Sequence, residues 1–443
     1  MPPSLLRRFA AVARSASSPA SHIQPYLAAE KASWLSPSDT LSILMIIGGD
    51  IVQRAVAQLA GSGPFTPYWH FTPVAFSFGW LAYSVSALTS VLGDGQLMPP
   101  PDCPIQVVNA RTGYQRQNAS WVLGRLFRDH EKRRISTKGG SLTVAFYRTA
   151  RDGREPGVPE HDWVYWSGVL VILAQLAISV IPGALHGNWI VLIVAVGGTL
   201  QALVASGLPQ WREEKYPERK IKPKKGPEVV CLTRGNGSTF VMVVVSETGI
   251  RLEALAGGHD GRRRSTAVVA AVLSVLWIVL LLTVEGLEGD AWYLLAIGGL
   301  GMAQNVVAAG AERSAGAHGF HLEPFREDRD IIEKGKVMTT LMATEERQPG
   351  VGLALLKLFF PGDLRLDEQE FWDKKKLEKA EREAVSRKAA KDASAGQTNV
   401  PADPPTGKEV TQIPIQHDIP GDAVHEVDKR PAKCDAVGAQ ALV

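Results

Sequence analysis

Three consecutive stretches decide the fold: VYWSGVLVILAQLAISVI (Val164–Ile181), PGALHGN (Pro182–Asn188) and WIVLIVAVGGTLQALVASGL (Trp189–Leu208). The two long stretches contain no Asp, Glu, Lys or Arg, and each comes close to the roughly 20 residues that cross a bilayer as a helix. The short stretch between them also lacks Lys and Arg. This pattern predicts a helical hairpin that spans a membrane.

The same pattern recurs along the chain and predicts six spans. They pair into three hairpins: Leu41–Leu59 with Phe71–Leu92, Val164–Ile181 with Trp189–Leu208, and Thr266–Val284 with Ala291–Gly310. Lys and Arg together number 4 before the first span, 11 and 12 in the two long connections and 20 after the last span, against none in the short gaps. The positive-inside rule therefore predicts that both termini and both long connections face the cytosol.

We accordingly expect a mainly α polytopic membrane protein with a small α+β cytosolic portion. Its predicted parts are a basic cytosolic leader (1–40), the first hairpin (41–92), a cytosolic loop with an amphipathic basic helix (93–163), the second hairpin (164–208), a cytosolic loop with a β-hairpin (209–265), the third hairpin (266–310), a cytosolic helical segment (311–393) and a disordered tail (394–443). Prolines and polar residues, with scarcely an aromatic, predict the disorder of the tail.

The leader has the composition of a mitochondrial transit peptide, since Met1–Ala29 contains three arginines and no acidic residue. Its prolines leave little room for a helix. An endomembrane or plasma-membrane location is therefore favoured, with the mitochondrion as the alternative.

In the first cytosolic loop, Ile105–Val108 predicts a short strand and Ala119–Arg134 a basic amphipathic helix. Two interpretations of the helix stay open: it lies on anionic lipid headgroups, or it packs on other cytosolic segments. The candidate lipid-surface contacts are Arg125, Arg128, Lys132, Arg133 and Arg134.

The second cytosolic loop begins with a polybasic run, Lys215–Lys225. The β-branched runs Val229–Thr233 and Thr239–Ser246 flank Gly235-Asn236-Gly237 and predict a hairpin, and Ile250–Leu255 predicts one more strand. No P-loop lysine follows the glycines, so we expect no nucleotide site.

An internal repeat emerges when the fourth and sixth spans are aligned at an offset of 103 residues. Among the positions that then match are Trp189 with Trp292, Gly198 with Gly301, Gln201 with Gln304 and Gly207 with Gly310. This predicts two hairpins of one design in parallel orientation.

The C-terminal region contains three predicted helices. Arg326–Glu346 is amphipathic, Val351–Phe360 is too short to span and either inserts at the membrane interface or caps the cytosolic core, and Asp367–Ala393 is highly charged. We expect this C-terminal segment to be where a cytosolic protein partner binds.

Polar side chains within the predicted spans form the candidate intramembrane site. They are Asp50, Arg54, Gln53, Gln201, Gln304 and Asn305. Asp50 and Arg54 are spaced to neutralise each other on one helix face. Both helix packing and a solute or ion pathway are consistent with these residues.

Sequence motifs for catalysis are lacking, and we expect neither an enzyme nor a cofactor. The pair His318 and His321 with Glu323 could offer metal ligands, but no further cluster stands out, so no metal site is predicted. The three cysteines fit no metal spacing and are expected to be reduced.

Four stretches carry a resemblance to a known family: FTPVAFSFGWLAYSVSALTSVLGDGQLMP from Phe71, GYQRQNASWVLGRL from Gly113, LTRGNGS from Leu232 and PGVGLALLKLFFPGDLR from Pro349. They resemble an uncharacterised family of fungal multi-pass membrane proteins, over roughly Leu41–Trp372. The resemblance implies a fungal membrane protein and no particular chemistry.

The function that these features favour is a non-catalytic membrane scaffold or adaptor. Its expected partners are the lipid bilayer, anionic headgroups and a cytosolic protein, with no nucleic acid. The alternative is a small-solute transporter or channel that uses the repeated hairpins and the pair Asp50 and Arg54.

Overall fold

The structure is a computed structural model of the whole chain. It describes residues 48–61, 64–66, 69–134, 141–150, 154–216, 227–258, 261, 263–285, 290–325 and 330–396. The leader, residues 41–47 of the first predicted span and most of the predicted C-terminal tail lie outside the described residues.

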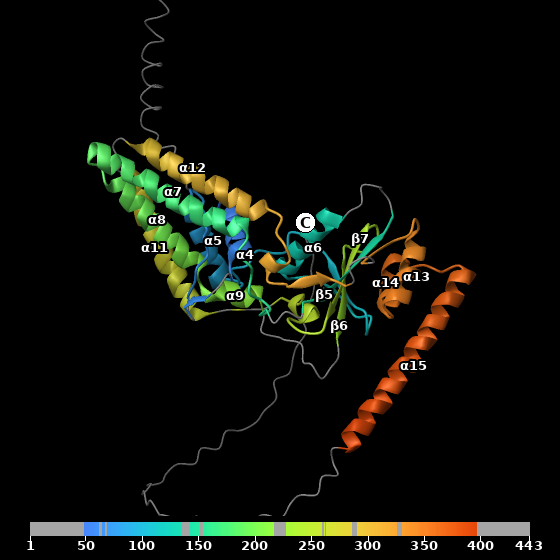
Figure 1. Cartoon of the computed structure of the whole chain (residues 1–443). Coiled ribbons are helices and arrows are strands. Elements are labelled where there is room, and N and C mark those ends of the chain that lie inside the picture. Colours follow the sequence, from blue (N-terminus) through green and yellow to red (C-terminus); the bar gives the residue numbers. More distant parts are fainter. Residues whose placement is uncertain are drawn as a thin grey trace, which may run out of the picture. The chain divides into compact units, whose positions relative to one another are not determined.

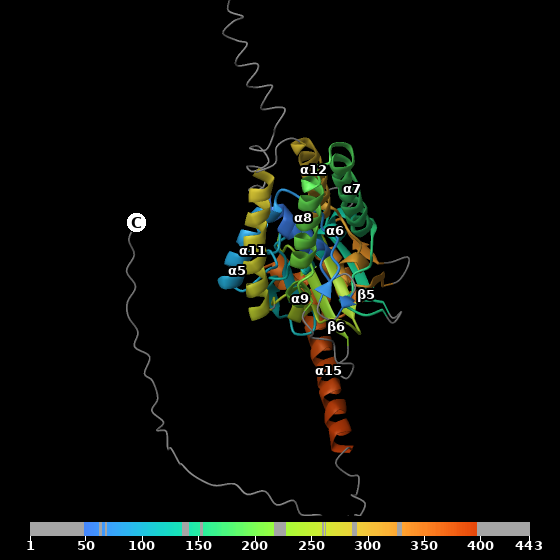
Figure 2. The same ribbon diagram turned by 90° about the vertical axis from the view of Figure 1, so that its left-hand side faces the viewer.

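Among the described residues, four helices are long and apolar enough to cross a membrane: α7 (Trp163–His186), α8 (Ile190–Ser206, continued by α9, Pro209–Lys215), α11 (Arg264–Glu285) and α12 (Ala291–Gly310). They correspond to the second and third predicted hairpins. In Figures 1 and 2 they lie side by side as one bundle. The beginnings of α7 and α11 and the ends of α8 and α12 lie at the end of the bundle nearer the sheet.

The first predicted hairpin is not formed by two helices of spanning length. Its helices are α4 (Gly49–Leu59) and α5 (Trp80–Leu92), with 11 and 13 residues. At 1.5 Å per residue they extend about 16 and 20 Å, short of the ~30 Å hydrocarbon core. The strands β1 (Pro64–Thr66) and β2 (Trp69–His70) pair between them.

The prediction of one span over Phe71–Leu92 is wrong in its first third. Residues Phe71–Gly79, here called the interior segment, are non-helical. Pro73 explains this locally, because it lacks an amide hydrogen and disfavours helical geometry at Thr72. Eight of the nine residues, from Thr72 to Gly79, are buried. The segment therefore runs through the protein interior and is not exposed to lipid.

Glycines of the repeated helices make room for the interior segment. A Cβ on Gly198 would lie 2.7 Å from the ring of Phe76, and one on Gly301 would overlap the carbonyl oxygen of Phe76. These two glycines match at the 103-residue offset predicted from the sequence. The two equivalent helices thus contact the same residue of the interior segment.

The second part of the fold is a mixed sheet in the order β4-β3-β6-β7-β5-β8, with β9 also paired to β5. Its strands are β3 (Gln106–Asn109), β4 (Gln115–Gln117), β5 (Thr143–Thr149), β6 (Glu228–Thr233), β7 (Phe240–Ser246), β8 (Leu322–Pro324) and β9 (Ile331–Glu333). The antiparallel pair of β6 and β7 confirms the predicted hairpin. β5 and β7 pair in parallel.

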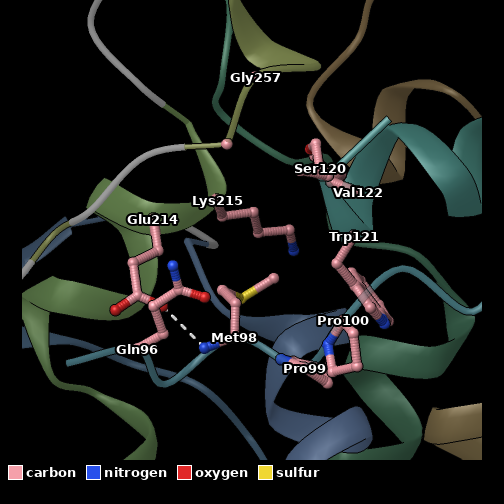
Figure 3. A pocket seen from close by; sticks show the side chains of 12 residues that line it. Gln96, Met98, Pro99, Pro100, Ser120, Trp121, Val122, Glu214, Lys215 and Gly257 are labelled. Carbon is pink, nitrogen blue, oxygen red and sulfur yellow. Dashed lines mark hydrogen bonds between the residues drawn. The ribbon is translucent and has the colours of Figure 1, made fainter. Parts of the chain in front are cut away.

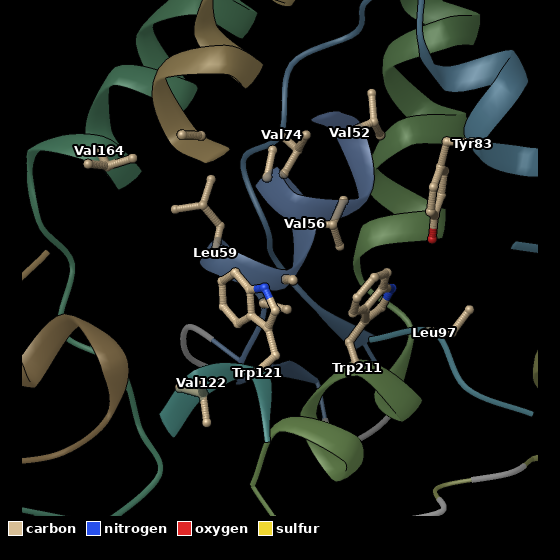
Figure 4. Close-up of a cluster of buried hydrophobic side chains, with 14 of the residues drawn as sticks. Val52, Val56, Leu59, Val74, Tyr83, Leu97, Trp121, Val122, Val164 and Trp211 are labelled. Carbon is tan, nitrogen blue, oxygen red and sulfur yellow. The ribbon is translucent and has the colours of Figure 1, made fainter. Parts of the chain in front are cut away.

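Both faces of the sheet are covered, which explains why all seven residues of β7 are buried. Phe240, Met242 and Val244 share a core with α6 (Trp121–Arg134) and the bundle. Val241 and Val243 share a second core with α13 (Val337–Arg347) and α14 (Val351–Phe359). One hydrophobic core therefore continues from the bundle into the sheet, and part of it is drawn in Figure 4.

The remaining elements correct two predictions and decide between two interpretations of a third. Ile250–Leu255 contains the short helix α10 (Leu252–Leu255), not a strand. The helix predicted from Arg326 begins at Val337, because Ile331–Glu333 pairs with β5 instead. α14 packs into the second core, as the capping interpretation proposed. The charged helix is α15 (Leu366–Gly396), which crosses from the unit Met1–Arg382 into a second unit, Glu383–Val443.

Candidate functional site at the junction of the bundle and the sheet

The predicted intramembrane site does not assemble around Asp50 and Arg54. Both side chains are exposed on α4, and no ion pair joins them within 4.0 Å. Gln53, on the same helix, donates to the carbonyl of Leu97 at 2.8 Å. These three residues therefore form no shared site in the described part of the chain.

Two polar residues of α12 make internal contacts: Asn305 holds the interior segment, and Gln304 joins α12 to α7. Asn305 donates from Nδ2 to the carbonyl of Ala75 at 3.2 Å and to Oγ of Ser77 at 2.8 Å. Gln304 donates from Nε2 to Oγ of Ser167 on α7 at 3.0 Å. Both side chains therefore contribute to packing, which is one of the two interpretations that the sequence left open.

Gln175 on α7 also binds the interior segment. Its Nε2 donates to the carbonyls of Phe76 and Ile297, at 2.7 and 2.8 Å. Gln201, which the repeat aligns with Gln304, has instead a buried Oε1 without a hydrogen-bond partner in the described structure. The repeat therefore conserves the glycine contacts but not this polar contact.

The basic helix α6 packs inside the protein along most of its length. Arg125 is 1% exposed, bonds the carbonyl of Ala309 and lies 3.1 Å from the carboxylate of Asp102. Arg128 pairs with Asp129 at 2.7 Å. These two arginines serve internal contacts, which corrects their prediction as lipid-surface residues.

The last turn of α6 differs, because its three basic side chains are exposed. Lys132 forms an ion pair with Glu312 at 3.1 Å. Arg133 and Arg134 are the two candidate lipid contacts that remain on the surface without an ion pair among the described residues. A surface role for α6 is therefore restricted to its C-terminal end.

A buried polar cluster occupies the junction between the bundle and the sheet, and Asp129 of α6 lies at its centre. Its Oδ2 lies 3.0 Å from Nε2 of His318 and accepts the backbone amide of Arg313 at 3.0 Å. Its Oδ1 accepts two hydrogen bonds from Arg128, at 2.7 and 2.9 Å. Every hydrogen-bonding direction of this buried carboxylate is thus used.

The second anion of the junction is Asp162, the N-cap of α7, whose Oδ1 accepts the amide of Tyr165 at 3.1 Å. Arg313, just beyond α12, donates to both of its carboxylate oxygens, at 2.7 and 2.9 Å. The remaining nitrogen of Arg313 donates to the carbonyl of Gln58 at 2.7 Å. Bidentate pairing of this kind is strong and directional.

Lys215 begins the predicted polybasic run and is 1% exposed, while the rest of the run beyond residue 216 lies outside the described residues. Its Nζ donates to the carbonyls of Gln58 and Ala60 at 3.0 and 2.9 Å. The neighbouring Tyr216 donates its hydroxyl to the carbonyl of His318 at 2.7 Å. The end of α9 is thereby joined to α4 and to the short 3₁₀ helix η2 (Gly316–His318).

Burial and hydrogen bonds determine which groups of the cluster carry a charge. Burial lowers the pKa of His318 to about 4, so the imidazole is neutral at pH 7. Burial alone would raise the pKa of Asp129, but hydrogen bonds from His318, Arg313 and Arg128 keep it below its ordinary value. The carboxylate is therefore ionised and shared between neutral and cationic donors.

The histidine motif beyond the last span is divided between two environments. His318 bonds Asp129, whereas His321 lies 3.3 Å from Glu160. Within the described ranges, no group of three or more His, Cys, Asp or Glu side chains is placed to hold a metal ion. Cys103 and Cys231 are buried free thiols.

Sequence reasoning missed Asp129, Asp162 and Arg313 as partners in one cluster. A signal did exist: Asp162 directly precedes one apolar window and Arg313 closely follows another. Side chains at the ends of spanning helices lie outside the hydrocarbon core, so opposite charges at neighbouring ends can form an ion pair there. The sequence predicted the hairpins of α7 with α8 and of α11 with α12, but neither the packing of α12 against α7 nor the contact between Asp162 and Arg313.

Comparison with known proteins adds no relative. The chain matches no protein-family model, no curated protein and no solved structure. The resemblance to fungal multi-pass membrane proteins therefore stays a prediction.

Proposed function

We propose that this protein is a non-catalytic membrane scaffold. Four apolar helices anchor a cytosolic sheet domain at the membrane, and the C-terminal segment recruits a protein partner. One observation carries this proposal: polar groups inside the bundle are used for packing. Gln175 and Asn305 bind carbonyls of the interior segment, and Phe76 fills the space between the repeated glycines.

The buried contacts at the junction support an anchoring role, because they hold the sheet domain in a fixed position relative to the bundle. Arg313 binds groups at the ends of α4 and α7 from its place just beyond α12. Asp129 binds His318 and Arg313 from α6, which itself packs on the sheet. Relative motion of the sheet domain and the bundle would have to break these buried contacts together.

The C-terminal segment is the proposed partner site. Trp372 is fully buried in the second core and holds the beginning of α15 on the sheet domain. Beyond it, Lys375 and Arg382 both pair with Glu378, so charges are distributed along the helix. A helix that is polar on all sides is suited to bridging through solvent toward a partner.

Affinity purification in mild detergent tests the proposal. Three proteins are compared by mass spectrometry: the full chain, a chain ending at Arg382, and a full-length chain in which residues 383–443 are scrambled. Because Trp372 is kept, the shortened chain should unfold at the same temperature as the full chain. A near-stoichiometric partner that is present with the full chain alone supports a scaffold. Identical co-purifying proteins in all three samples would contradict it.

A small-solute transporter is the second candidate, and the interior segment is the observation that favours it. Non-helical backbone at membrane depth, placed between repeated hairpins, lines the substrate path in several transporter classes. Flux of small solutes into vesicles containing the purified protein is the test. Flux that disappears in Asn305→Leu without loss of folded protein would favour this candidate over the scaffold.

A further inference from the structure

A cavity of about 440 Å³ lies between the beginning of α6, the end of α9 and the chain near Met98 (Figure 3). Its volume falls in the range of roughly 300–1,000 Å³ that small-molecule sites occupy. Gly257 and Gly258 form another wall. None of the roles described above uses this space.

A buried lysine faces the cavity. The side chain of Lys215 lies across it, with Nζ directed toward Trp121 (Figure 3). Two of the three Nζ hydrogens are donated to backbone carbonyls, and within the described residues no carboxylate lies within 4.0 Å of this ammonium group. Burial lowers the pKa of Lys215 well below its ordinary value, because the charged form is poorly solvated there, and an anion in the cavity would stabilise the ammonium form.

The beginning of α6 supplies further donors to the same space. Ser120 is 7% exposed and lines the cavity, and its hydroxyl has no hydrogen-bond partner among the described residues. The backbone amides of Trp121 and Val122, in the first turn of this 14-residue helix, likewise have no recorded acceptor there. Free amides at a helix beginning attract anions, and phosphate most of all.

One carboxylate lines the cavity too, and its bonding explains why it does not neutralise Lys215. The oxygens of Glu214 accept the amides of Leu97 and Met98 at 2.7 to 3.0 Å and Nε2 of Gln210 at 2.6 Å. These donors occupy its lone pairs and hold it toward the chain near Met98, as Figure 3 shows.

The rest of the lining indicates what the anion is attached to. Met98, Pro99 and Pro100 give the cavity an apolar wall. Because α9 directly follows α8, the cavity also lies at the end of the bundle, where lipid headgroups meet a helix that spans a membrane. A ligand with one phosphate and a short apolar portion fits both walls.

We propose that this cavity binds a phosphate monoester, held by Lys215, Ser120 and the first amides of α6. Its source is either the headgroup of a phosphatidic-acid type of lipid or a soluble phosphate ester. The proposal goes beyond a scaffold role, since it assigns a ligand site to the anchored domain, and it does not depend on the C-terminal partner.

The test is a binding titration of the full chain, purified in a phosphate-free detergent. The probes are dihexanoyl phosphatidic acid, glycerol 3-phosphate and dihexanoylglycerol, which lacks the phosphate. Saturable binding of the first probe and none of the third supports the site. Equal affinity for glycerol 3-phosphate assigns a soluble ester, whereas much weaker affinity assigns a lipid.

Variants locate the binding. Ser120→Ala should weaken it roughly tenfold, as expected for a hydrogen bond to a charged group. Ala119→Trp, at an exposed position on the cavity wall, should abolish binding by filling the space. Lys132→Met, which removes one exposed charge from the same helix, is the control and should bind as the wild type does. Lys215→Met is a less decisive variant, since it also removes bonds to α4. Absence of saturable binding, or equal binding by all variants, would overturn the proposal.

Discussion

Arg313 donates to both carboxylate oxygens of Asp162, at 2.7 Å from Nε and 2.9 Å from Nη2. Asp162 caps the beginning of α7, and Arg313 follows the end of α12. A third bond from Arg313, to the carbonyl of Gln58, adds the end of α4. One buried guanidinium therefore joins three helix ends at the side of the bundle that carries the sheet.

Replacing Arg313 by Met should lower the free energy of unfolding by about 3–5 kcal/mol, because it leaves a largely buried carboxylate without its cation. The measurement is the thermal midpoint of the purified protein in detergent. Arg263→Met is the matched control: Arg263 pairs with Glu213 but is 46% exposed. Exposed pairs contribute about 0–1 kcal/mol. Equal shifts in the two variants would show that the junction pair is not a principal contact.

Gly301→Ala should destabilise the bundle by about 1–3 kcal/mol, because its Cβ would overlap the Phe76 carbonyl, which is backbone and cannot rotate away. Gly299→Ala, two residues earlier on the same helix, is the control, since no atom lies within 4 Å of its Cβ position. Thermal midpoints of the two variants are compared. If Gly301→Ala unfolds no earlier than Gly299→Ala, the interior segment does not lie against α12 as described.

Gln175→Leu should cost about 1–3 kcal/mol, because two buried carbonyls, those of Phe76 and Ile297, lose their donor. Gln201→Leu on the neighbouring helix should be neutral or stabilising, since the buried Oε1 of Gln201 has no partner among the described residues. Chemical unfolding in mixed micelles measures both. Comparable losses would mean that the two glutamines contribute alike and that the assigned bonds are wrong.

The stability of the junction should depend on pH through His318. Burial lowers its pKa from 6.5 to about 4 in the folded protein, so between these values the unfolded chain binds a proton that the folded chain does not. The free energy of unfolding should therefore be highest above pH 6.5 and fall by up to about 3 kcal/mol as the pH decreases to about 4.

A pH series of thermal midpoints, recorded for the wild type and for His318→Gln, measures this dependence. The variant should lose much of the slope between pH 6.5 and 4. His186→Gln, at a histidine that is 54% exposed, is the control and should keep the slope. A variant slope equal to that of the wild type would assign the pH dependence to other groups.

Prediction from sequence succeeded where local composition determines structure. The windows beginning at Val164, Trp189, Thr266 and Ala291 are continuous apolar runs, and all four form long helices. The hairpin around Gly235 also follows from local pattern, because β-branched runs flank a turn of glycine and asparagine. The repeated glycines were visible as an offset of the sequence against itself.

Prediction from sequence failed where contacts with residues far away in the sequence determine the structure. Ile331–Glu333 has helical periodicity with its neighbours, yet it pairs with β5 in the sheet. Arg125 belongs to a basic face in sequence, but the carbonyl of Ala309 and the carboxylate of Asp102 turn that face inward. Apolar content alone does not distinguish a spanning helix from a buried extended segment, which is why Phe71–Gly79 was assigned to a span.

The most direct test of the scaffold account is hydrogen–deuterium exchange of peptides from Phe71–Gly79, measured by mass spectrometry on the protein in lipid nanodiscs. The account holds that the bundle is a closed anchor around this segment. It predicts exchange as slow as that of α12, although few of the segment's amides are bonded within regular structure. Exchange within seconds, at the rate of an exposed loop, would show that water reaches the interior and would contradict a closed anchor.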